Sequence, residues 1–269
     1  MNEGFANHKI ITEANSLPTI TVIIATYNAE TYLAGCIQSV LEQSYPYYEL
    51  FIIDGGSTDR TLSIIEQYKH HIAYWTSEPD QGIYDAWNKG IRKATGSWIA
   101  FIGSDDLLYP NALQTFVDHI LAHPKQNQLE FISSTIELVD ENLSPIRVVG
   151  DAWSWDKFSR FMNTWHVGAF HSSRLFSTYG LFNTSYKISG DYELLLRAND
   201  RLVTSFVPVN TVRMRTGGVS NVNLIRASEE TYRAKVANKV ISPIKGYVLK
   251  YIDRFRLEVR KRTNGKFLL

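Results

Sequence analysis

The sequence predicts an α/β fold built on a doubly wound mixed sheet, with a helical extension at the C-terminus. From residue 19 onwards, short runs rich in β-branched residues alternate with longer segments of helical periodicity. Polar segments that contain Gly and Asp follow several of these runs, as happens where parallel strands open into a crevice. Of the 269 residues, 44% are hydrophobic and 13% aromatic, so the chain can bury a substantial core and is not disordered as a whole.

The alternating pattern is clearest in the first half of the chain. In residues 30–43, for example, Leu33, Ile37 and Leu41 share one helical face, and Pro46 follows the end of the segment. Four strand–helix units in succession form one half of a doubly wound sheet. The strands expected here are 20–25, 49–53, 72–76 and 98–102, and the helices are 30–43, 61–68 and 83–93.

Beyond Pro110 the periodicity is weaker, and no repeat, low-complexity segment or proline-rich linker divides the chain. We expect a helix to about residue 121, strands near 131–138 and 146–149, and an aromatic stretch over 153–170. The simplest division is an N-terminal extension at 1–18, one compact domain at 19–240 and a basic C-terminal helix at 241–269.

Cysteine use and the N-terminal segment indicate the compartment. Cys36 is the only cysteine, which excludes an intramolecular disulfide and a multi-cysteine zinc site and suits a core position on a helix. Residues 1–18 contain neither the basic nor the apolar region of a signal peptide. No apolar run reaches the roughly 18 residues that a membrane-spanning helix needs. We therefore expect a cytoplasmic protein.

Two adjacent carboxylates follow the fourth expected strand, which leads directly into Gly103-Ser104-Asp105-Asp106. Hard oxygen ligands suit Mg²⁺ or Mn²⁺. A divalent ion held there can bridge the two phosphates of a nucleoside diphosphate and neutralise charge on the departing group. Because Asp is also common in turns and helix caps, a cap before Pro110 is the alternative interpretation.

The first two expected strands also end in polar segments. Asp54 precedes a glycine-rich loop, where its carboxylate can accept hydrogen bonds from a base or a ribose. The loop lacks the spacing and the lysine of a phosphate-binding P-loop. Tyr27 follows the first strand, and its ring can stack on a nucleobase. Structural alternatives stay open, because Asp59 can cap the next helix after a simple turn and Tyr27 can be an ordinary tyrosine.

A longer stretch after the third strand completes the pattern. It reads Glu-Pro-Asp-Gln-Gly-Ile-Tyr-Asp-Ala-Trp-Asn-Lys-Gly over 78–90 and contains Asp80. Two further pieces are Asp-Gly-Gly-Ser-Thr-Asp at 54–59 and Ser-Asp-Asp at 104–106. In this order and spacing the three pieces resemble the family 2 glycosyltransferases, which have the Rossmann-like GT-A fold. The resemblance covers about residues 19–205.

The resemblance implies transfer of a sugar from a nucleoside diphosphate to an acceptor hydroxyl. One departure concerns the base: many members carry a second Asp where this chain has Gly55, so the resemblance leaves the identity of the base open. The implied donor-side residues are Tyr27, Asp54, Asp80 and Asp105, which face the nucleotide sugar, and Asp106, which binds Mn²⁺ or Mg²⁺ directly.

A further acidic residue, Asp191, lies far along the chain in Ser-Gly-Asp-Tyr-Glu at 189–193. The resemblance makes it the general base that takes the proton of the acceptor hydroxyl as this group attacks the anomeric carbon. A base and a leaving phosphate on opposite sides of that carbon predict an inverted product. Asp191 also suits a cap for the apolar helix that begins near Leu194, and the two roles are compatible.

Two segments are candidates for contact with the acceptor and the diphosphate. Residues 165–171 line up with the family's acceptor-side segment, in which aromatic faces suit a pyranose, and His166 is the candidate contact there. A structural position suits this histidine as well. Arg213 and Arg215 could meet the diphosphate from a loop through 217–218, which could also be an ordinary turn.

The C-terminal segment carries much of the positive charge. Residues 241–269 contain eight Lys and Arg against two acids, a net charge of +6, whereas the whole chain carries +1. An amphipathic helix is predicted, which either binds an anionic membrane on the inner face of the plasma membrane or docks its apolar stripe on the domain. Nucleic acid is not an expected partner because the rest of the chain is acidic. The stripe comprises Ile244, Val248, Tyr251, Ile252, Phe255 and Val259, and the basic face comprises Lys250, Arg254, Arg260 and Lys261.

These observations together predict an inverting glycosyltransferase. It would use a metal-bound nucleotide sugar, with uridine as the expected nucleoside, to extend a surface polysaccharide or a lipid-linked oligosaccharide. A nucleotidyltransferase also joins a doubly wound sheet to paired acids, but residues 26–30 lack the glycine-rich basic loop expected of that class. The alternative from another class is a catalytically inactive carbohydrate-binding protein, against which the intact Asp105, Asp106 and Asp191 argue.

Overall fold

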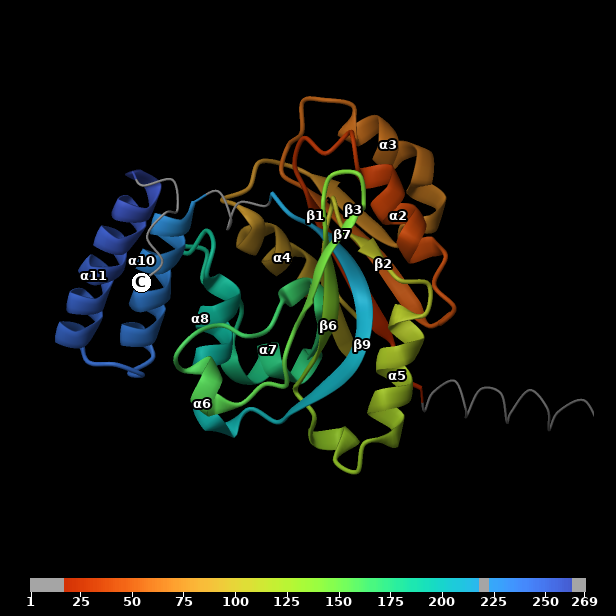
Figure 1. The fold of residues 1–269 in the computed structure, drawn as a ribbon. Helices are drawn as coiled ribbons and strands as arrows, with labels where there is room; N and C mark the ends of the chain where they lie inside the picture. The colour runs from red at the N-terminus through yellow and green to blue at the C-terminus, as the bar shows by residue number, and fades with distance from the viewer. Residues whose placement is uncertain (1–16, 218–222, 263–269) are drawn as a thin grey trace, which may run out of the picture.

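The computed structural model describes residues 17–217 and 223–262, so most of the predicted N-terminal extension lies outside the described residues. Within these ranges nine strands form one mixed sheet, and helices cover both of its faces (Figure 1). The predicted α/β class is confirmed. From one edge to the other, the strands are β3 (Tyr74–Ser77), β2 (Tyr48–Asp54), β1 (Ile20–Thr26), β4 (Trp98–Gly103), β8 (Ala169–Ser172), β6 (Phe131–Val139), β9 (Thr204–Arg215) and β5 (Leu107–Leu108), with β7 (Pro145–Val149) paired to β6.

The four strands predicted in the first half form the parallel part of the sheet. β1 pairs in parallel with β2 and β4, and β2 pairs in parallel with β3. Most side chains of β1, β2 and β4 are buried, as expected for parallel strands covered on both faces, and this explains their continuous apolar runs. The helices that connect them are α2 (Leu33–Leu41), α3 (Thr61–Tyr68) and α4 (Ile83–Ile91).

Helix α2 is shorter than the predicted 30–43 because the segment before it belongs to a loop. The N–H of Ala29 donates to Oγ1 of Thr61 (2.8 Å), and the N–H of Glu30 donates to the carboxylate of Asp59 (3.1 Å). These bonds tie the loop after β1 to the loop after β2. Side-chain acceptors on a neighbouring loop therefore decide where the helix begins.

The second half of the sheet contains both antiparallel and parallel strand pairs. β8 runs antiparallel to both β4 and β6, whereas β6 and β9 are parallel and β5 returns antiparallel along β9. The predicted helix to about residue 121 is α5 (Ala112–Ala122), and the two predicted strands are β6 and β7. The aromatic stretch contains the short helix α6 (Trp155–Phe158) and then enters β8.

Two apolar layers fill the space between the sheet and its helices. Ile24 of β1 packs in the layer beneath α2 and α5, which also contains Cys36, and its neighbour Ile23 packs in the other layer. That second layer lies beneath α4, α7 (Ser173–Tyr179) and α8 (Gly190–Leu196). Full burial of one such aliphatic side chain contributes roughly 1.5–3 kcal/mol, so the two layers hold the strand ends firmly.

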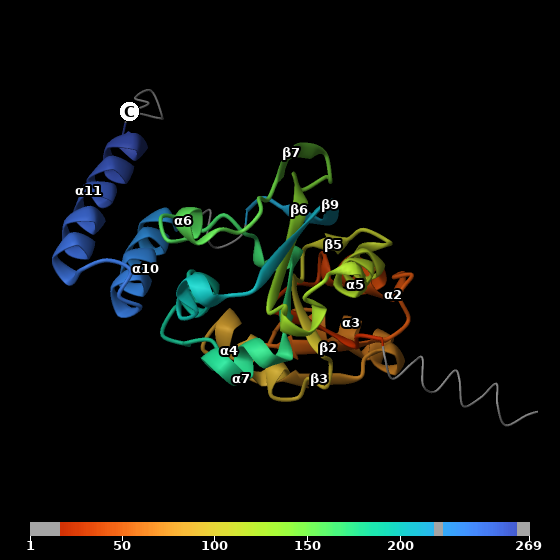
Figure 2. The same ribbon diagram turned by 90° about the horizontal axis from the view of Figure 1, so that it is seen from below.

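The last two helices, α10 (Leu224–Ala237) and α11 (Pro243–Arg262), form a hairpin beside the sheet (Figures 1 and 2). α10 packs against α8, and α11 packs against α10, where a side chain on Gly246 would collide with Val236. Of the C-terminal helix predicted at 241–269, residues 243–262 are helical and residues 263–269 lie outside the described ones. The domain border at 240 stays a prediction. Across both described ranges, every helix falls short of the length or the apolar character that a bilayer span requires.

Candidate active site

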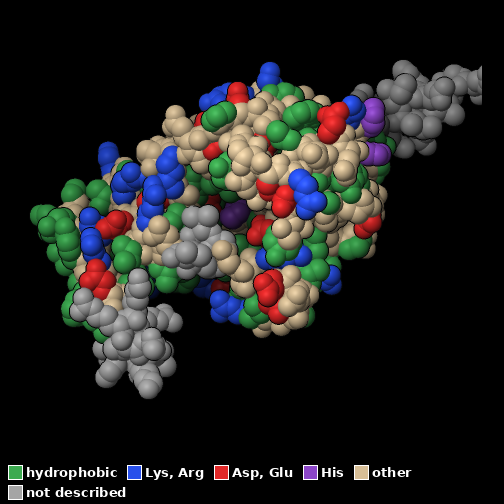
Figure 3. Space-filling view, turned by 90° about the horizontal axis from the view of Figure 1, so that it is seen from above, with side chains coloured by type: hydrophobic (Ala, Val, Ile, Leu, Met, Phe, Trp, Pro, Cys, Tyr) green, Lys and Arg blue, Asp and Glu red, His purple; other side chains and the backbone are tan. Residues whose placement is uncertain are grey.

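The polar strand ends lie in one row at the carboxyl edge of the parallel strands. In the register of the sheet, Asp54 of β2 lies beside Thr26 of β1 and Ser77 of β3, and Gly103 of β4 lies beside Ala25 of β1. The four segments that follow these residues therefore leave the sheet at the same edge. Seen from above, the molecule is hollowed near the middle of its face, with a histidine at the bottom of the hollow and acidic side chains beside it (Figure 3).

Asp54 is fully buried, and its carboxylate orders the loop that follows β2. Oδ2 accepts the N–H groups of Gly56 (3.0 Å) and Ser57 (2.9 Å). The hydroxyls of Ser57 and Ser77 donate to the same carboxylate. Asp54 is 0% exposed, and its carboxylate is used inside the protein. Its predicted contact with the nucleotide stays a prediction.

Tyr27, in contrast, is exposed because its loop is held by the residue after it. Asn28 has a φ of 48°, a left-handed conformation that Asn tolerates better than most residues. Its N–H donates to Oγ of Ser57 (2.8 Å), and its side-chain oxygen accepts the N–H of Thr58 (2.9 Å). The Tyr27 side chain is left 63% exposed, so a face of its ring is available for stacking.

Asp80 occupies the space into which a side chain at position 55 would point. A Cβ on Gly55 would lie 2.7 Å from Oδ2 of Asp80 and 3.5 Å from a ring carbon of Tyr27. The other oxygen, Oδ1, accepts the N–H of Gly82 (2.7 Å), which fixes the orientation of the carboxylate. A carboxylate from the segment after β3 thus stands where the resemblance would have placed one on residue 55.

Asp105 and Asp106 converge over Gly103. A Cβ on Gly103 would lie 2.6 Å from Oδ2 of Asp106 and 3.0 Å from Oδ1 of Asp105, so glycine is needed to leave room for both. Asp106 is buried, and its Oδ1 accepts the N–H of Arg215 (3.1 Å). Burial, and then the charge of Asp105, raise the pKa of Asp106 well above its usual value, although the hydrogen bond from Arg215 acts in the opposite direction.

The two convergent carboxylate oxygens fit a divalent cation. A cation between Asp105 and Asp106 would offset both the burial of the charge and the mutual repulsion of the two groups. Among the described residues, no group of three or more His, Cys, Asp or Glu side chains could hold a metal, and this includes the present site. Two carboxylates make up only part of the usual shell of Mg²⁺, so a diphosphate and water would complete it.

The two arginines of β9 have different surroundings. The guanidinium of Arg215 donates to the carbonyl oxygen of Asp105, which places it beside the paired acids. Arg213 forms an ion pair with Glu137 (3.3 Å) and is already used in the fold. Of the loop predicted to carry both arginines, Gly218 lies outside the described residues. Arg215 is thus the one that the structure brings to the acids.

Asp191 is held at the start of α8 by contacts from distant segments. Its Oδ1 lies 3.0 Å from the hydroxyl of Tyr84 and accepts the N–H of Tyr192 (2.9 Å). Burial, and then the charge of Asp191, raise the pKa of Tyr84 well above its usual value, so the hydroxyl keeps its single proton, which the carbonyl of Ile188 (2.6 Å) and the carboxylate of Asp191 share. Oδ2 lies 3.5 Å from Nδ1 of His166, the candidate acceptor residue. One oxygen of Asp191 is therefore fixed, and the other faces the acceptor-side segment.

The cap position of α8 belongs to Ser189, and Asp191 lies in the first turn of the helix. A carboxylate in the first turn is still favourable for the helix, as the alternative interpretation of Asp191 requires. Between the two, Gly190 lets α8 approach α4, since a Cβ there would lie 2.7 Å from the ring of Tyr84. The Ser-Gly-Asp sequence thus brings Asp191 against Tyr84.

Other residues of the 78–90 stretch hold the fold. The side chain of Asn88 donates to the carbonyl of Phe182 (2.8 Å) and accepts its N–H (3.0 Å), and Lys89 pairs with Glu78 (3.0 Å). Sequence reasoning did not assign a role to Tyr84 within this stretch. Its contact with Asp191 joins residues 107 positions apart, and no local pattern signals such a contact.

Comparison with known proteins identifies the family of this chain. A family model described as glycosyl transferase family 2 matches residues 21–179. The chain belongs to this family. The predicted glycosyltransferase class and GT-A fold are thereby confirmed. A PGL/p-HBAD biosynthesis glycosyltransferase of Mycobacterium tuberculosis is 30% identical over 210 residues, which cover 76% of this chain and 80% of the relative.

Further relatives of this family 2 glycosyltransferase come from other groups of organisms. A dolichyl N-acetyl-alpha-D-glucosaminyl phosphate 3-beta-D-2,3-diacetamido-2,3-dideoxy-beta-D-glucuronosyltransferase of Methanococcus voltae is 28% identical over 225 residues, covering 72% of this chain and 68% of the relative. The chondroitin synthase of Escherichia coli is 26% identical over 257 residues, which are 92% of this chain and 36% of that protein.

Solved structures share the fold at low sequence identity. TarS of S. aureus, residues 1–349 in complex with UDP-GlcNAc, has a TM-score of 0.63 and 18% identity over 81% of this chain and 66% of its own. The mannosyltransferase PcManGT from Pyrobaculum calidifontis, in complex with GDP-Man and Mn²⁺, has a TM-score of 0.60 and 19% identity over 82% and 64%. The family 2 chain therefore spans about two thirds of either solved chain.

Proposed function

We propose that this glycosyltransferase moves one sugar from a nucleoside diphosphate to a hydroxyl of a glycan or lipid-linked acceptor, with inversion at the anomeric carbon. The observation that carries the proposal is the convergence of Asp105 and Asp106 over Gly103, at the edge where Tyr27 and Asp80 also leave the sheet. Two comparisons support it: TarS has been solved with UDP-GlcNAc, and the Methanococcus relative is named for a dolichyl-linked sugar phosphate.

On the donor side, Asp106 would hold Mn²⁺ or Mg²⁺ together with Asp105. Such an ion supplies positive charge where the leaving diphosphate becomes more negative. The exposed ring of Tyr27 would stack face to face on the flat ring of the base. Oδ2 of Asp80, beside that ring, would accept a hydrogen bond from an N–H on the base edge, and uracil has one.

On the acceptor side, Asp191 would act as the general base. Tyr84 and the N–H of Tyr192 hold Oδ1, so Oδ2 is the oxygen that takes the proton of the acceptor hydroxyl. The acceptor oxygen forms its bond to the anomeric carbon as the bond to the diphosphate breaks, and this single displacement inverts the configuration. His166, 3.5 Å from Asp191, would contact the acceptor beside the attacking hydroxyl.

A donor-hydrolysis screen tests the proposal before any acceptor is known. UDP-, GDP- and dTDP-linked sugars are incubated with the protein, with and without Mn²⁺, and the released nucleoside diphosphate is measured. We expect metal-dependent release from a UDP-sugar, which falls in Asp80→Ala because the base loses a hydrogen-bond acceptor. If a protein that melts cooperatively releases nothing from any of these donors, the proposed function is wrong.

We further propose that α11 binds an anionic membrane surface and so brings the site to a lipid-linked acceptor. The face of α11 toward α10 includes Gly246 and Asp253, the latter bonded to Tyr232. The apolar stripe lies on the opposite face, where Ile244 is 80% and Phe255 is 68% exposed. Docking of this stripe on the domain, the alternative from the sequence, would have covered these side chains.

Charged residues of α11 are arranged in keeping with this proposal. With 100° between successive helical residues, Lys245 and Arg256 flank the stripe on one side and Arg254 flanks it on the other. A stripe between basic flanks can enter an interface while cations meet anionic headgroups, each worth about 1 kcal/mol. Arg254 and Arg256 also pair with acids, Arg254 with Glu258 (3.2 Å) and Arg256 with Asp253 (3.6 Å). The side chains of Arg260 and Lys261, which the sequence placed on the basic face, lie outside the described ones.

A further inference from the structure

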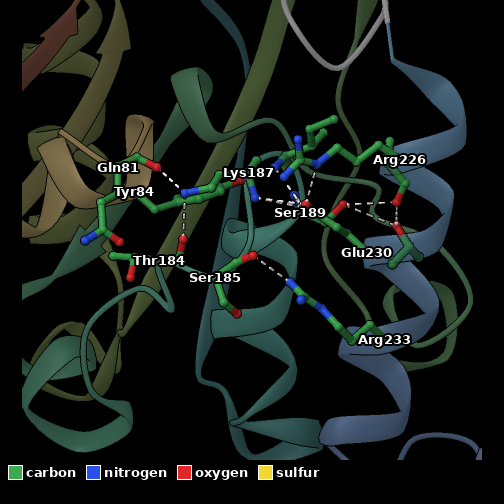
Figure 4. Close-up of polar contacts among 12 residues, drawn as sticks. Gln81, Tyr84, Thr184, Ser185, Lys187, Ser189, Arg226, Glu230 and Arg233 are labelled. Atoms are coloured by element: carbon green, nitrogen blue, oxygen red, sulfur yellow. Dashed lines mark hydrogen bonds and ion pairs between the residues drawn. The ribbon is translucent and has the colours of Figure 1, made fainter. Parts of the chain in front are cut away.

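The segment that leads into α8 is bound by a carboxylate of α10. Glu230 is 6% exposed, and its two oxygens accept the N–H groups of three consecutive residues (Figure 4). The distances are 2.9 and 3.0 Å from Lys187, 2.8 Å from Ile188 and 3.1 Å from Ser189. Asp191 follows this segment by two residues. The position of the candidate base thus depends on a side chain of the C-terminal hairpin.

Two further contacts join the same segment to its surroundings. The hydroxyl of Ser189 donates to the carbonyl of Ala227, one turn before Glu230 on α10 (3.2 Å). On the other side, the ammonium of Lys187 donates to the carbonyl of Gln81, directly after Asp80 (Figure 4). Lys187 therefore links the donor-side segment to the segment that carries Asp191, while Glu230 holds its backbone.

The charge of Glu230 is maintained in spite of its burial. Burial by itself raises the pKa of this carboxyl, but the N–H groups of Ile188, Ser189 and Lys187 and the side chain of Arg226 outweigh it, so the pKa is lowered overall. Arg226 lies 3.1 Å away and is half exposed. A buried N–H group left without an acceptor costs about 1–3 kcal/mol, and the N–H of Ser189 is buried, so the segment would rearrange if the carboxylate were removed.

We propose that Glu230 is a positioning residue for the transfer step: by holding residues 187–189 it sets the place of Asp191 relative to the acceptor hydroxyl. The inference rests on the proposed role of Asp191 as the base. A general base must lie within hydrogen-bond reach of the proton it removes, and a misplacement of about 1 Å can cost on the order of 10²-fold in rate. Helix α10 therefore belongs functionally to the catalytic domain.

The test compares Glu230→Ala and Glu230→Gln with Glu229→Gln, a matched control whose side chain is 37% exposed and pairs with Arg254 of α11. Turnover is measured with the UDP-sugar identified by the screen, and affinity is measured with UDP and Mn²⁺. We expect kcat to fall about 10²-fold in Glu230→Ala and less in Glu230→Gln, which keeps one acceptor oxygen. UDP affinity should change less than about twofold, and Glu229→Gln should behave as wild type.

A double substitution separates positioning from a general loss of structure. If Glu230 acts only through Asp191, its substitution should not lower kcat further in a protein that already carries Asp191→Asn. The double variant Asp191→Asn with Glu230→Ala should therefore have the same kcat as Asp191→Asn alone. Hydrogen exchange should be faster at residues 187–189 in Glu230→Ala and unchanged in β1 and β4. If Glu230→Ala does not fold, Glu230→Gln gives the answer by the same measurements.

The outcomes distinguish this inference from the function on which it rests. Full turnover in Asp191→Asn would overturn the proposed base itself. Loss of turnover in Asp191→Asn together with full turnover in both Glu230 variants would overturn only the positioning role. An additional loss in the double variant would also overturn it, because Glu230 would then act on something other than Asp191.

Discussion

The paired acids after β4 and the candidate base on α8 lie in one molecule but are held in different ways. Asp105 and Asp106 follow a strand whose register with β1 and burial between two apolar layers fix its end. Asp191 is fixed by single side chains from other elements, Tyr84 of α4 directly and Glu230 of α10 through the preceding segment. Donor binding should therefore tolerate substitutions of Tyr84 and Glu230, whereas turnover should not.

The largest effect is expected at the strand-end acids. Asp106→Asn should abolish Mn²⁺-dependent binding of UDP and lower transfer by at least about 10³-fold, because a lost metal ligand removes several kcal/mol of charge stabilisation. Asn keeps an oxygen for the N–H of Arg215. The pKa of Asp106 is raised in the folded state, so the ionised carboxylate costs stability there, and Tm of the metal-free variant should not fall.

Calorimetric titration of UDP, with and without Mn²⁺, measures this effect. Asp118→Asn is the control, since this exposed residue of α5 only accepts a hydrogen bond from Gln114. Unchanged metal-dependent affinity in Asp106→Asn would remove this residue from the metal site and with it the contrast between the two regions.

The next effect is expected at the base. Asp191→Asn should lower kcat by about 10²–10⁴-fold and leave UDP affinity intact, because only proton removal in the transition state is lost. Asn can still accept the bond from the Tyr84 hydroxyl, so the local structure should survive. Initial rates with acceptor and a separate UDP titration measure the two quantities, and Asp200→Asn, an exposed acid nearby in the chain, is the control. A parallel fall in UDP affinity would contradict the separation of the regions.

A smaller effect, visible only with lipid, is expected from α11. Ile244→Asn combined with Phe255→Asn should reduce binding to anionic vesicles by at least tenfold, since each buried apolar side chain contributes roughly 1.5–3 kcal/mol. Leu121→Asn, an exposed apolar residue of α5, should bind vesicles as wild type does. Co-sedimentation at low and high salt measures the binding, which screening should weaken. Failure of the wild-type protein to sediment with anionic vesicles contradicts the membrane proposal.

The smallest effect concerns stability at β8, the strand that pairs with β4 and β6. Burial, and then the charge of His166, lower the pKa of His171 from 6.5 to about 3. As pH falls below 6.5, the unfolded chain binds a proton that the folded chain does not, so the free energy of unfolding decreases down to about pH 3.

His171→Phe should remove this part of the pH dependence. The ring lies among Phe101 and Phe131, with centroids 5.3 and 5.1 Å away, so Phe suits the site. Between pH 7 and 5, wild type should lose about 1–2 kcal/mol more than the variant in urea unfolding. An identical loss in both proteins would show that His171 titrates normally.

The sequence predicted the parallel half well because its signals are local. Apolar runs marked β1, β2 and β4 to within one or two residues, and parallel strand ends meet at one edge whatever the rest of the chain does. The positions of Asp105 and Asp106 followed from this rule. Local patterns did not reveal that the loop after β1 forms hydrogen bonds with Asp59 and Thr61, which follow β2. The start of α2 was therefore predicted too early.

By itself, the sequence determined the α/β class, the strand-end row of acids and the family, because each depends on residues close together in the chain. Tertiary structure alone decided that Asp54 turns into its own loop, that Asp80 fills the space beside Gly55, and that Glu230 holds the segment before Asp191. It also decided that the apolar stripe of α11 faces outward. The physical reason is common to all four: periodicity tells which residues share a face, but what covers that face comes from segments far away in sequence.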